Sequence, residues 1–399
     1  MEIFKREMIL EKIEPFIDLD VVKILVGMRR CGKSTCMEQI VDLLINRGIS
    51  KDDIIYIDME SKKAPVFENA DELYDHIIGQ CGQSRKYILL DEIQNLDGWE
   101  SCVRALMKDA DCDIYLTGSN SKMLSGELAT HLSGRYVEIP VMPFAFKEVR
   151  DIMGEMDTDV LFRKYLVHGG MPLVVSTGYN ESVVDSILTA MYDSVVINDI
   201  AERNRVKDVS VMRKVLLYIV SEIGHSISAK RISDYLISQK NKVSVDTVIN
   251  YMGYAESAMF IRKVPRYDLR GKELMKNECK YYLTDIGIRE ALELNNMSSI
   301  DQVLENVVLI ELLNRGYRVY VGKIGDKEID FVAQKGNNIE YYQVSYLIAS
   351  EETAKREFGS LMSIQDNFPK YVLSMDSLDL SRDGIVHRNI VDWLCDMRS

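Results

Sequence analysis

Residues 21–35 read VVKILVGMRRCGKST, an apolar run followed by a loop with two glycines and the start of a helical pattern. The loop fits the pattern G-x-x-x-x-G-K-[ST], in which backbone N–H groups and the positive end of the following helix hold phosphates. We expect Lys33 to reach the terminal phosphates and the Ser34 hydroxyl to bind Mg²⁺. An ordinary glycine turn is the weaker alternative, because a strand precedes the loop and a helix follows it. The predicted phosphate-contacting residues are Gly27, Met28, Arg29, Arg30, Cys31, Gly32, Lys33, Ser34 and Thr35.

A second motif follows the strand predicted over 86–91, where four apolar residues lead to Asp91 and Glu92. In phosphate-loop enzymes, the first carboxylate at such a strand end assists Mg²⁺, and a second one next to it can polarise the attacking water. We therefore expect Asp91 to assist Mg²⁺ and Glu92 to be the catalytic base of ATP hydrolysis. A carboxylate pair after a strand is by itself more often a solvated turn, and the upstream loop is what makes this pair significant.

Alternating strand and helix patterns surround the two motifs. Apolar spacing closer to 3.6 than to 2 predicts helices over 34–46 and 70–81. Together with the strands, this order predicts a doubly wound α/β domain with a parallel sheet. The strand that separates the two motifs favours the ATPase branch with an additional sheet strand over the kinase and GTPase branch. The five predicted strands are 21–26, 54–59, 86–91, 113–117 and 136–141.

Two further positions are candidates for contacts with the γ-phosphate. Ser119 and Asn120 follow the strand at 113–117, where a polar residue can sense the phosphate or the water, and a plain polar turn is the alternative. Arg135 precedes the last strand and is a candidate arginine finger for the site of a neighbouring subunit. A merely solvated arginine is an equally good interpretation of Arg135.

The composition limits the class of protein. The chain has 399 residues, 47% hydrophobic and 28% charged, and its length suggests roughly two to four domains. Its net charge of −13 excludes a basic coat for nucleic acid. The N-terminus lacks a signal-peptide pattern and the apolar runs are too short to span a bilayer, so we expect a soluble, cytoplasmic protein without a membrane partner. The seven cysteines contain no C-x-x-C, which argues against disulfides and structural zinc.

Helical patterns dominate after residue 143, and those at 209–223, 228–238 and 244–259 precede a strand–turn–strand pattern. Three helices and a hairpin are the layout of a winged helix-turn-helix. Residues 205–280 carry fifteen basic and eight acidic side chains, a local charge of +7. We expect residues 244–254 to form the groove helix for double-stranded DNA, although winged helices also bind proteins. The candidate phosphate contacts of the wing are Arg262, Lys263, Arg266, Arg270 and Lys272.

Several motifs carry a resemblance to a known family: GMRRCGKS, YILLDEIQN, YLTGSNSKML, LSGRYVEIPVMPFAFKEV, HGGMP, KYYLTDIGIREAL and LENVVLIELLNRGY. With them the whole chain resembles the prokaryotic AAA-type P-loop ATPases that have a C-terminal DUF4143 domain. The resemblance implies an ATP-binding and ATP-hydrolysing module, a winged-helix middle domain and a C-terminal domain related to PD-(D/E)xK nucleases.

Nucleases of that fold place Mg²⁺-binding carboxylates at a strand end, with a lysine two residues beyond the second one to activate water. The resemblance implies that Glu305, Asp330 and Gln343 take the metal-binding positions, but Ser345 stands at the lysine position. Serine cannot supply a positive charge, so we expect a degenerate site without nuclease activity. Lys335 or Lys323 on a neighbouring strand is the alternative source of the lysine.

The predicted domains are an AAA-like ATPase domain (1–142), a helical connector (143–205), a winged helix (206–296) and a nuclease-like DUF4143 domain (297–399). We expect a homo-oligomer that binds ATP, ADP and Mg²⁺, hydrolyses ATP, and couples its nucleotide state to DNA or to a partner through the winged helix. One alternative is a nucleotide-gated regulatory protein with slow hydrolysis and a protein partner. The other is an ATP-regulated, Mg²⁺-dependent nuclease.

Overall fold

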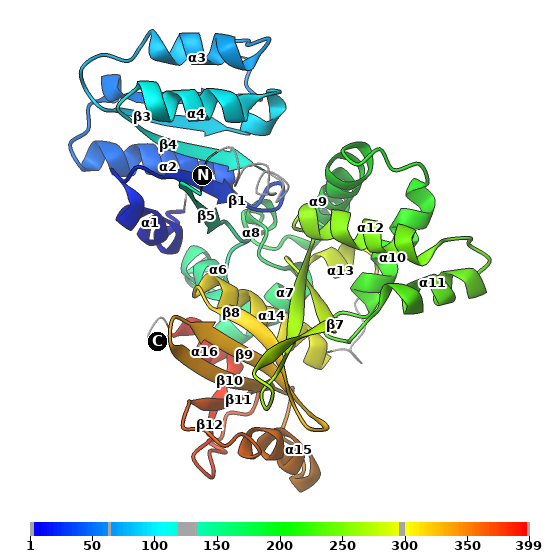
Figure 1. Cartoon of the computed structure of the whole chain (residues 1–399). Coiled ribbons are helices and arrows are strands. Elements are labelled where there is room, and N and C mark those ends of the chain that lie inside the picture. The colour runs from blue at the N-terminus through cyan, green and yellow to red at the C-terminus, as the bar shows by residue number, and fades with distance from the viewer. Residues whose placement is uncertain (1–3, 63–64, 119–131, 133, 295–299, 397–399) are drawn as a thin grey trace. The chain divides into compact units, whose positions relative to one another are not determined.

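The structure is a computed structural model that describes residues 4–62, 65–118, 132, 134–294 and 300–396 (Figure 1). It divides into two compact units. The first comprises Met1–Val141 with Ser257–Met259, and the second comprises Met142–Glu256 with Phe260–Ser399. The first unit ends next to the predicted boundary at 142. The predicted boundaries inside the second unit stay predictions.

A parallel sheet of five strands forms the first unit, in the order β2-β3-β4-β1-β5. Each strand matches its predicted range to within one residue. β4 lies between β1 and β3, with Leu25 opposite Thr117 and Leu90 opposite Leu116. The strand inserted between the two motif strands is therefore β4, whereas β2, which separates the two motifs in the sequence, lies at the edge of the sheet. The strands are β1 (Val22–Val26), β2 (Ile54–Asp58), β3 (Lys86–Asp91), β4 (Cys112–Gly118) and β5 (Tyr136–Pro140).

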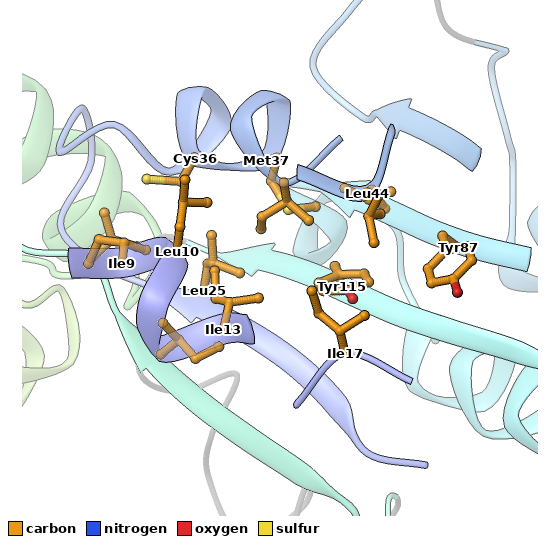
Figure 2. Packing of buried hydrophobic residues seen from close by; sticks show 14 of the residues in the cluster. Ile9, Leu10, Ile13, Ile17, Leu25, Cys36, Met37, Leu44, Tyr87 and Tyr115 are labelled. Atoms are coloured by element: carbon orange, nitrogen blue, oxygen red, sulfur yellow. The ribbon is translucent and has the colours of Figure 1, made fainter. Parts of the chain in front are cut away.

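The helices of this unit are α1 (Glu7–Ile13), α2 (Lys33–Asn46), α3 (Ala70–Ile78) and α4 (Trp99–Asp109), with 3₁₀ turns η1 (Glu14–Phe16), η2 (Lys51–Asp53) and η3 (Ile93–Asn95). Sequence patterns predicted α2 and α3 but neither α1 nor α4. Figure 2 shows Ile9, Leu10 and Ile13 of α1 packed with Cys36 and Met37 of α2. Burying each such aliphatic side chain is worth roughly 1.5–3 kcal/mol, so this core fixes α1 beside the start of α2.

The amino edge of this sheet is held by a buried ion pair. Lys23 and Asp113 both have fully buried side chains and contact each other, and Lys23 also donates to the carbonyl of Leu19 at 3.0 Å. The Tyr115 hydroxyl donates to the same carboxylate at 2.9 Å. Burial lowers the pKa of Lys23, and the hydrogen bond to Asp113 opposes that shift. The lysine that interrupts the apolar run of β1 therefore has a structural partner.

The second unit begins with helices and contains one large sheet. The helices before the sheet are α6 (Phe146–Met153), α7 (Thr158–His168), α8 (Pro172–Val175), α9 (Glu181–Ser194), the π-helical η5 (Val195–Glu202), α10 (Val209–Ser221), α11 (Ala229–Ser238) and α12 (Val245–Ser257). The Ser228 and Ser244 hydroxyls accept hydrogen bonds from the backbone N–H groups of Arg231 and Thr247, so a serine caps the start of both α11 and α12.

The sheet of the second unit has seven strands in the order β12-β11-β10-β9-β8-β6-β7. β6 pairs with β7 in an antiparallel hairpin and with β8 in parallel, where Arg266 lies opposite Val321. The hairpin expected for a wing is thus part of the same sheet as the C-terminal strands. The strands are β6 (Ile261–Asp268), β7 (Glu273–Leu283), β8 (Arg318–Ile324), β9 (Lys327–Lys335), β10 (Asn338–Val344), β11 (Lys370–Ser374) and β12 (Val386–Asn389).

Among the described residues, this unit also contains α13 (Ile288–Ala291), α14 (Ile300–Asn314), α15 (Glu351–Met362) and α16 (Ile390–Cys395). α15 packs on the sheet through Ala354, Phe358 and Leu361, which share a buried cluster with Ile329 and Val372. Within the residues that the structure describes, no helix combines the length and the apolar character that crossing a bilayer requires.

Candidate functional site

The phosphate-binding motif forms the connection between β1 and α2. A Cβ atom at Gly27 would lie 2.2 Å from the carbonyl oxygen of Val141 and 2.6 Å from Sγ of Cys31, so only glycine fits there. Gly32 has a φ of 99° immediately before α2, a left-handed conformation that glycine adopts without steric cost. Packing requires the first glycine of the motif, and the backbone turn requires the second.

Lys33, the first residue of α2, turns back over this loop. Its side chain is buried, and Nζ donates to the carbonyl oxygens of Gly27 at 3.3 Å and Met28 at 3.5 Å. The same ammonium lies 3.4 Å from Oε1 of Glu92. The structure therefore brings the predicted phosphate-binding cation and the predicted base together.

The carboxylate of Asp91 ends β3 and is buried, with 1% of the residue exposed. Oδ1 accepts a hydrogen bond from the Thr117 hydroxyl, and Oδ2 accepts one from the Tyr56 hydroxyl at 3.2 Å. Burial and the neighbouring Asp91 carboxylate raise the pKa of Tyr56. Both oxygens of Asp91 are thus oriented by hydroxyl groups from the two adjacent strands.

Glu92 follows Asp91 with a φ of 51°. This left-handed conformation is uncommon for a residue with a side chain, costs about 1 kcal/mol or more, and is concentrated at functional sites. The Glu92 N–H donates to the Thr117 hydroxyl at 2.8 Å, and the side-chain amide of Gln94 donates to Oε2 of Glu92. The Thr117 hydroxyl therefore contacts both acidic residues, Asp91 through the aspartate side chain and Glu92 through the glutamate backbone N–H.

Sequence reasoning missed the roles of Thr117 and Tyr56. The polar residue near the end of β4 that contacts the acidic pair is Thr117, a position with no exposed surface. The predicted sensor residues Ser119 and Asn120 lie outside the described residues. A hydroxyl residue directly after the apolar run 114–116 was the signal for Thr117, whereas nothing local marks Tyr56.

The other residues of the motif differ in exposure. Met28 and Cys31 are buried, Ser34 is exposed in the first turn of α2, and Thr35 is half-buried. Arg29 is half-buried and Arg30 is exposed.

Arg135 lies away from this constellation in its own chain. Its carbonyl accepts a hydrogen bond from the N–H of Val22 at 3.0 Å, and its guanidinium lies 3.3 Å from the carboxylate of Asp20. These are contacts at the start of β1, whereas Gly27 follows the end of that strand. A role for Arg135 in the site of a neighbouring subunit stays a prediction.

Comparisons with known proteins place the first part of the chain among AAA domains. Residues 20–150 match a family model described as an AAA domain. An uncharacterised protein of Haemophilus influenzae is 38% identical over 396 residues, which is 98% of this chain and 98% of that protein. The chain belongs to that protein's family, a family of AAA-type P-loop ATPases. An uncharacterised protein of Methanocaldococcus jannaschii, MJ1544, is similar to this ATPase family member at 29% identity over 377 residues, 90% of this chain and 82% of that protein.

The Walker-type ATPase PABY2304 of Pyrococcus abyssi resembles this AAA-type chain in structure, with a TM-score of 0.50 and 17% sequence identity. The match covers 73% of this chain and 96% of that one, and it supports the P-loop ATPase fold. Residues 159–300 match a domain of unknown function, DUF8612. This is a different model from the DUF4143 domain that the resemblance implied, so the relationship to DUF4143 stays a prediction.

The three residues to which the resemblance assigns metal-binding positions lie near one another in the second unit. Glu305 lies on α14, Asp330 on β9 and Gln343 on β10. Oε1 of Gln343 accepts a hydrogen bond from the N–H of Asp330 at 3.4 Å, and Oδ2 of Asp330 accepts one from Val344 at 2.9 Å. Burial raises the pKa of Asp330 well above its usual value, and the negative charge of Glu305 adds to this shift.

A lysine from outside the predicted nuclease-like domain lies among these carboxylates. Lys280 of β7 places Nζ 3.4 Å from Oε2 of Glu305 and 2.8 Å from Oε1 of Glu328. Burial opposes its charge, but the carboxylates of Glu305, Asp330 and Glu328 raise the pKa of Lys280. Lys335 instead donates to the Arg315 carbonyl at 2.8 Å. In the described part of the chain, no three His, Cys, Asp or Glu side chains gather to hold a metal ion.

The predicted DNA contacts divide into two groups. Arg262 is half-buried with Nη2 3.1 Å from the sulfur of Met142, and Arg266 pairs with Glu328 and donates to Ser226 at 3.0 Å. Both arginines thus contact their own unit. Lys263, Arg270 and Lys272 are exposed.

The HGGMP segment at 168–172 connects α7 to α8 and contacts residues that follow β7. Asp285 is buried, and its carboxylate accepts hydrogen bonds from the N–H groups of Gly170 at 2.8 Å and Gly287 at 2.9 Å. Nδ1 of His168 lies 2.6 Å from Oε2 of Glu290. Burial raises the pKa of Asp285 to about 6, against the two backbone hydrogen bonds. These motif residues connect elements of the second unit.

Proposed function

We propose that the protein hydrolyses ATP with Mg²⁺ and couples its nucleotide state to binding of DNA or of a protein partner through a winged helix at residues 206–296. The observation that carries the ATPase part is the constellation at the carboxyl edge of the first sheet, where Lys33 contacts Glu92 and Thr117 contacts Asp91. In this proposal the loop N–H groups and Lys33 bind the phosphates, and Glu92 accepts the proton of the attacking water.

The side chains present suit magnesium carried by the nucleotide. Mg²⁺ is usually bound by one or two carboxylates together with substrate phosphates rather than by an all-protein cage. Asp91 and the exposed hydroxyl of Ser34 are oxygen ligands of the kind that Mg²⁺ prefers. Magnesium would neutralise the charge that develops on the phosphates. The Thr117 hydroxyl would keep the Asp91 carboxylate oriented for binding the magnesium.

The identity of the binding partner divides the proposal into two candidates. DNA as the partner is supported by exposed basic side chains. They are Lys240 and Lys242 in the turn before α12, and Arg270 and Lys272 of the hairpin. These side chains would contact phosphates, and α12 would enter the major groove.

A protein partner is the second candidate, favoured by the exposed surface of α12. That helix contains no Lys or Arg. Its exposed positions include Val245 and Ile249, which are 37% and 53% exposed, and the acidic residues Asp246 and Glu256. Phosphates would be repelled by such a surface, whereas an apolar protein segment flanked by basic residues would match it. The protein would then be a nucleotide-gated regulator with slow hydrolysis.

For the C-terminal region we propose a nuclease-like fold that does not cleave. Support comes from the order α14, β8, β9, β10, α15, β11, with Glu305, Asp330 and Gln343 near one another. Lys280 neutralises carboxylates that would otherwise attract a cation. Intact plasmid DNA after incubation with Mg²⁺ or Mn²⁺ is the expected result, and cleavage that is lost in Asp330→Ala would contradict it.

The first experiment is steady-state ATP hydrolysis with Mg²⁺, with and without duplex DNA, by the wild type, Glu92→Gln and Lys33→Ala. We expect hydrolysis by the wild type and none by the variants. Stimulation by DNA that disappears in a Lys240→Ala, Lys242→Ala double variant supports DNA coupling. A low rate that DNA does not change, with light scattering that differs between ATP and ADP, supports the protein-partner candidate. A wild type that neither binds nor hydrolyses ATP refutes the proposal.

A cytoplasmic location and a homo-oligomer belong to the same proposal. Arg135 is 48% exposed at its side chain, which leaves it accessible to a neighbouring subunit. An Arg135→Ala variant that binds ATP normally but hydrolyses it slowly, and regains activity when mixed with Glu92→Gln subunits, would support a role in a neighbouring site.

A further inference from the structure

The N-terminal segment contacts the phosphate-binding loop through Arg6. Arginine is almost never fully buried unless it has a partner, yet only 3% of Arg6 is exposed. Its Nη1 donates to the carbonyl oxygen of Cys31 at 3.5 Å. Cys31 lies inside the loop, one residue before the left-handed Gly32. Arg6 belongs to none of the sequence motifs, so the function described above does not use it.

The backbone around Arg6 is held by hydrogen bonds to α2, in addition to the contact that the Arg6 side chain makes with the loop. Its N–H donates to Oε1 of Gln39 at 3.0 Å, and the Gln39 amide donates to the carbonyl of Phe4 at 2.8 Å. Gln39 is buried on α2, the helix that begins at the end of the loop. Together with the packing of α1 seen in Figure 2, these bonds hold Arg6 against the loop.

The contact with Cys31 has a consequence for the next residue. The carbonyl of Cys31 and the N–H of Gly32 belong to one planar trans peptide, in which they point in opposite directions. Backbone N–H groups of this kind of loop are the groups that bind phosphates. A donor that fixes the carbonyl end of that peptide therefore also fixes the direction of the Gly32 N–H.

We propose that Arg6 is a positioning residue of the nucleotide site, which orients the Cys31–Gly32 peptide for the phosphates of a nucleoside di- or triphosphate. The inference rests on the proposed nucleotide-binding function. Because the loop contacts phosphates and not the base, Arg6 acts on the affinity for ATP and ADP and not on the choice of base. Preorganised donors of this kind improve binding by reducing the ordering cost on association.

The test compares Arg6→Gln, Arg6→Lys and the neighbouring control Lys5→Gln, whose side chain is 68% exposed and lies 3.7 Å from Glu7. Calorimetric titration should give Arg6→Gln about tenfold weaker binding of both ATP and ADP, equivalent to about 1.4 kcal/mol. KM should rise by a similar factor while kcat stays unchanged, as expected for uniform binding. Arg6→Lys, which keeps a charged donor, should recover part of the affinity, and Lys5→Gln should match the wild type.

Thermal melting without nucleotide separates this role from a purely structural one. Arg6→Gln should melt close to the wild type and lose most of the stabilisation that ATP gives. A folded Arg6→Gln with wild-type affinity, or an equal loss in Lys5→Gln, overturns the proposal. If Arg6→Gln does not fold, wild-type ATP affinity in folded Arg6→Lys and an unchanged KM overturn it. Failure of the wild type to bind ATP refutes the proposed function instead.

Discussion

Nζ of Lys33 lies 3.4 Å from Oε1 of Glu92, so the cation expected to bind phosphates and the base expected to activate water are each other's partners. A triphosphate must compete with the Glu92 carboxylate for this ammonium. Binding of the phosphates and release of the base are thereby linked through one side chain.

Glu92→Gln should bind ATP more tightly than the wild type, by up to about tenfold, because a neutral amide competes less for Lys33. Hydrolysis should fall below detection, since the amide cannot accept a proton. Titration calorimetry and a phosphate-release assay measure the two effects, with Glu100→Gln on α4 as the control. Turnover at the wild-type rate would show that Glu92 is not the base.

Thr117→Val should reduce kcat at least about tenfold, because it removes the hydroxyl that contacts both Asp91 and the Glu92 N–H. It should also lower the free energy of unfolding by about 1–3 kcal/mol, since two buried polar groups lose a partner. Thr117→Ser should retain activity. Equal losses in the two variants would mean that the methyl group, and not the hydroxyl, matters.

Gly27→Ala should abolish ATP binding and destabilise the first unit by about 1–3 kcal/mol or more, because the new Cβ meets the Val141 carbonyl at 2.2 Å. Gly82→Ala is the matched control, since a Cβ there meets no atom within 4 Å. Urea unfolding and ATP titration of both variants check the expectation. Wild-type behaviour of Gly27→Ala would contradict the loop geometry.

Lys280→Met should destabilise the protein by about 3–5 kcal/mol, because it leaves the Glu305 carboxylate buried beside Asp330 without a cation. Lys230→Met, at an exposed position of α11, should change the free energy of unfolding by less than about 0.5 kcal/mol. Adding Glu305→Gln to Lys280→Met should restore part of the stability. Additive losses in the double variant would argue against direct pairing.

The raised pKa of Asp285 predicts a specific pH dependence. Because the folded pKa is about 6 and the ordinary value is 3.8, the folded state binds the extra proton between these values. The contribution of this group is therefore favourable below about pH 4 and is lost as the pH rises through 6. Relative to Asp285→Asn, the wild type should lose roughly 3 kcal/mol between pH 4 and 7, at 1.36 kcal/mol per pKa unit. A pH-independent difference in urea unfolding would contradict this.

Local patterns were sufficient for the first sheet and for the loop. The strands of that sheet are short apolar runs, and the loop joins the first of them to a helix, so residues adjacent in sequence carried the information. α1 escaped prediction because it has only seven residues, too few for a periodic pattern to be recognised. Its stability comes from packing against α2, which no local pattern encodes.

Residues brought together by distant pairing could not be predicted. Thr117 meets Asp91 only because β4 is inserted next to β3, and that register is a property of the sheet. Lys280 precedes Glu305 by twenty-five positions and was assigned to another domain. The ammonium beside Glu305 belongs to Lys280 of the hairpin, whereas Lys335 donates to the Arg315 carbonyl.

The parallel pairing of β6 with β8 has a practical consequence for shortened forms of this chain. Removal of the residues after 296 would strip Arg266, Tyr267 and Asp268 of their partners Val321, Gly322 and Lys323. The exposed backbone edge would then be a template for pairing with other molecules, which is a common origin of aggregation. A fragment of residues 206–296 alone would therefore be prone to aggregation. Binding to DNA or to a protein should be measured with the full chain.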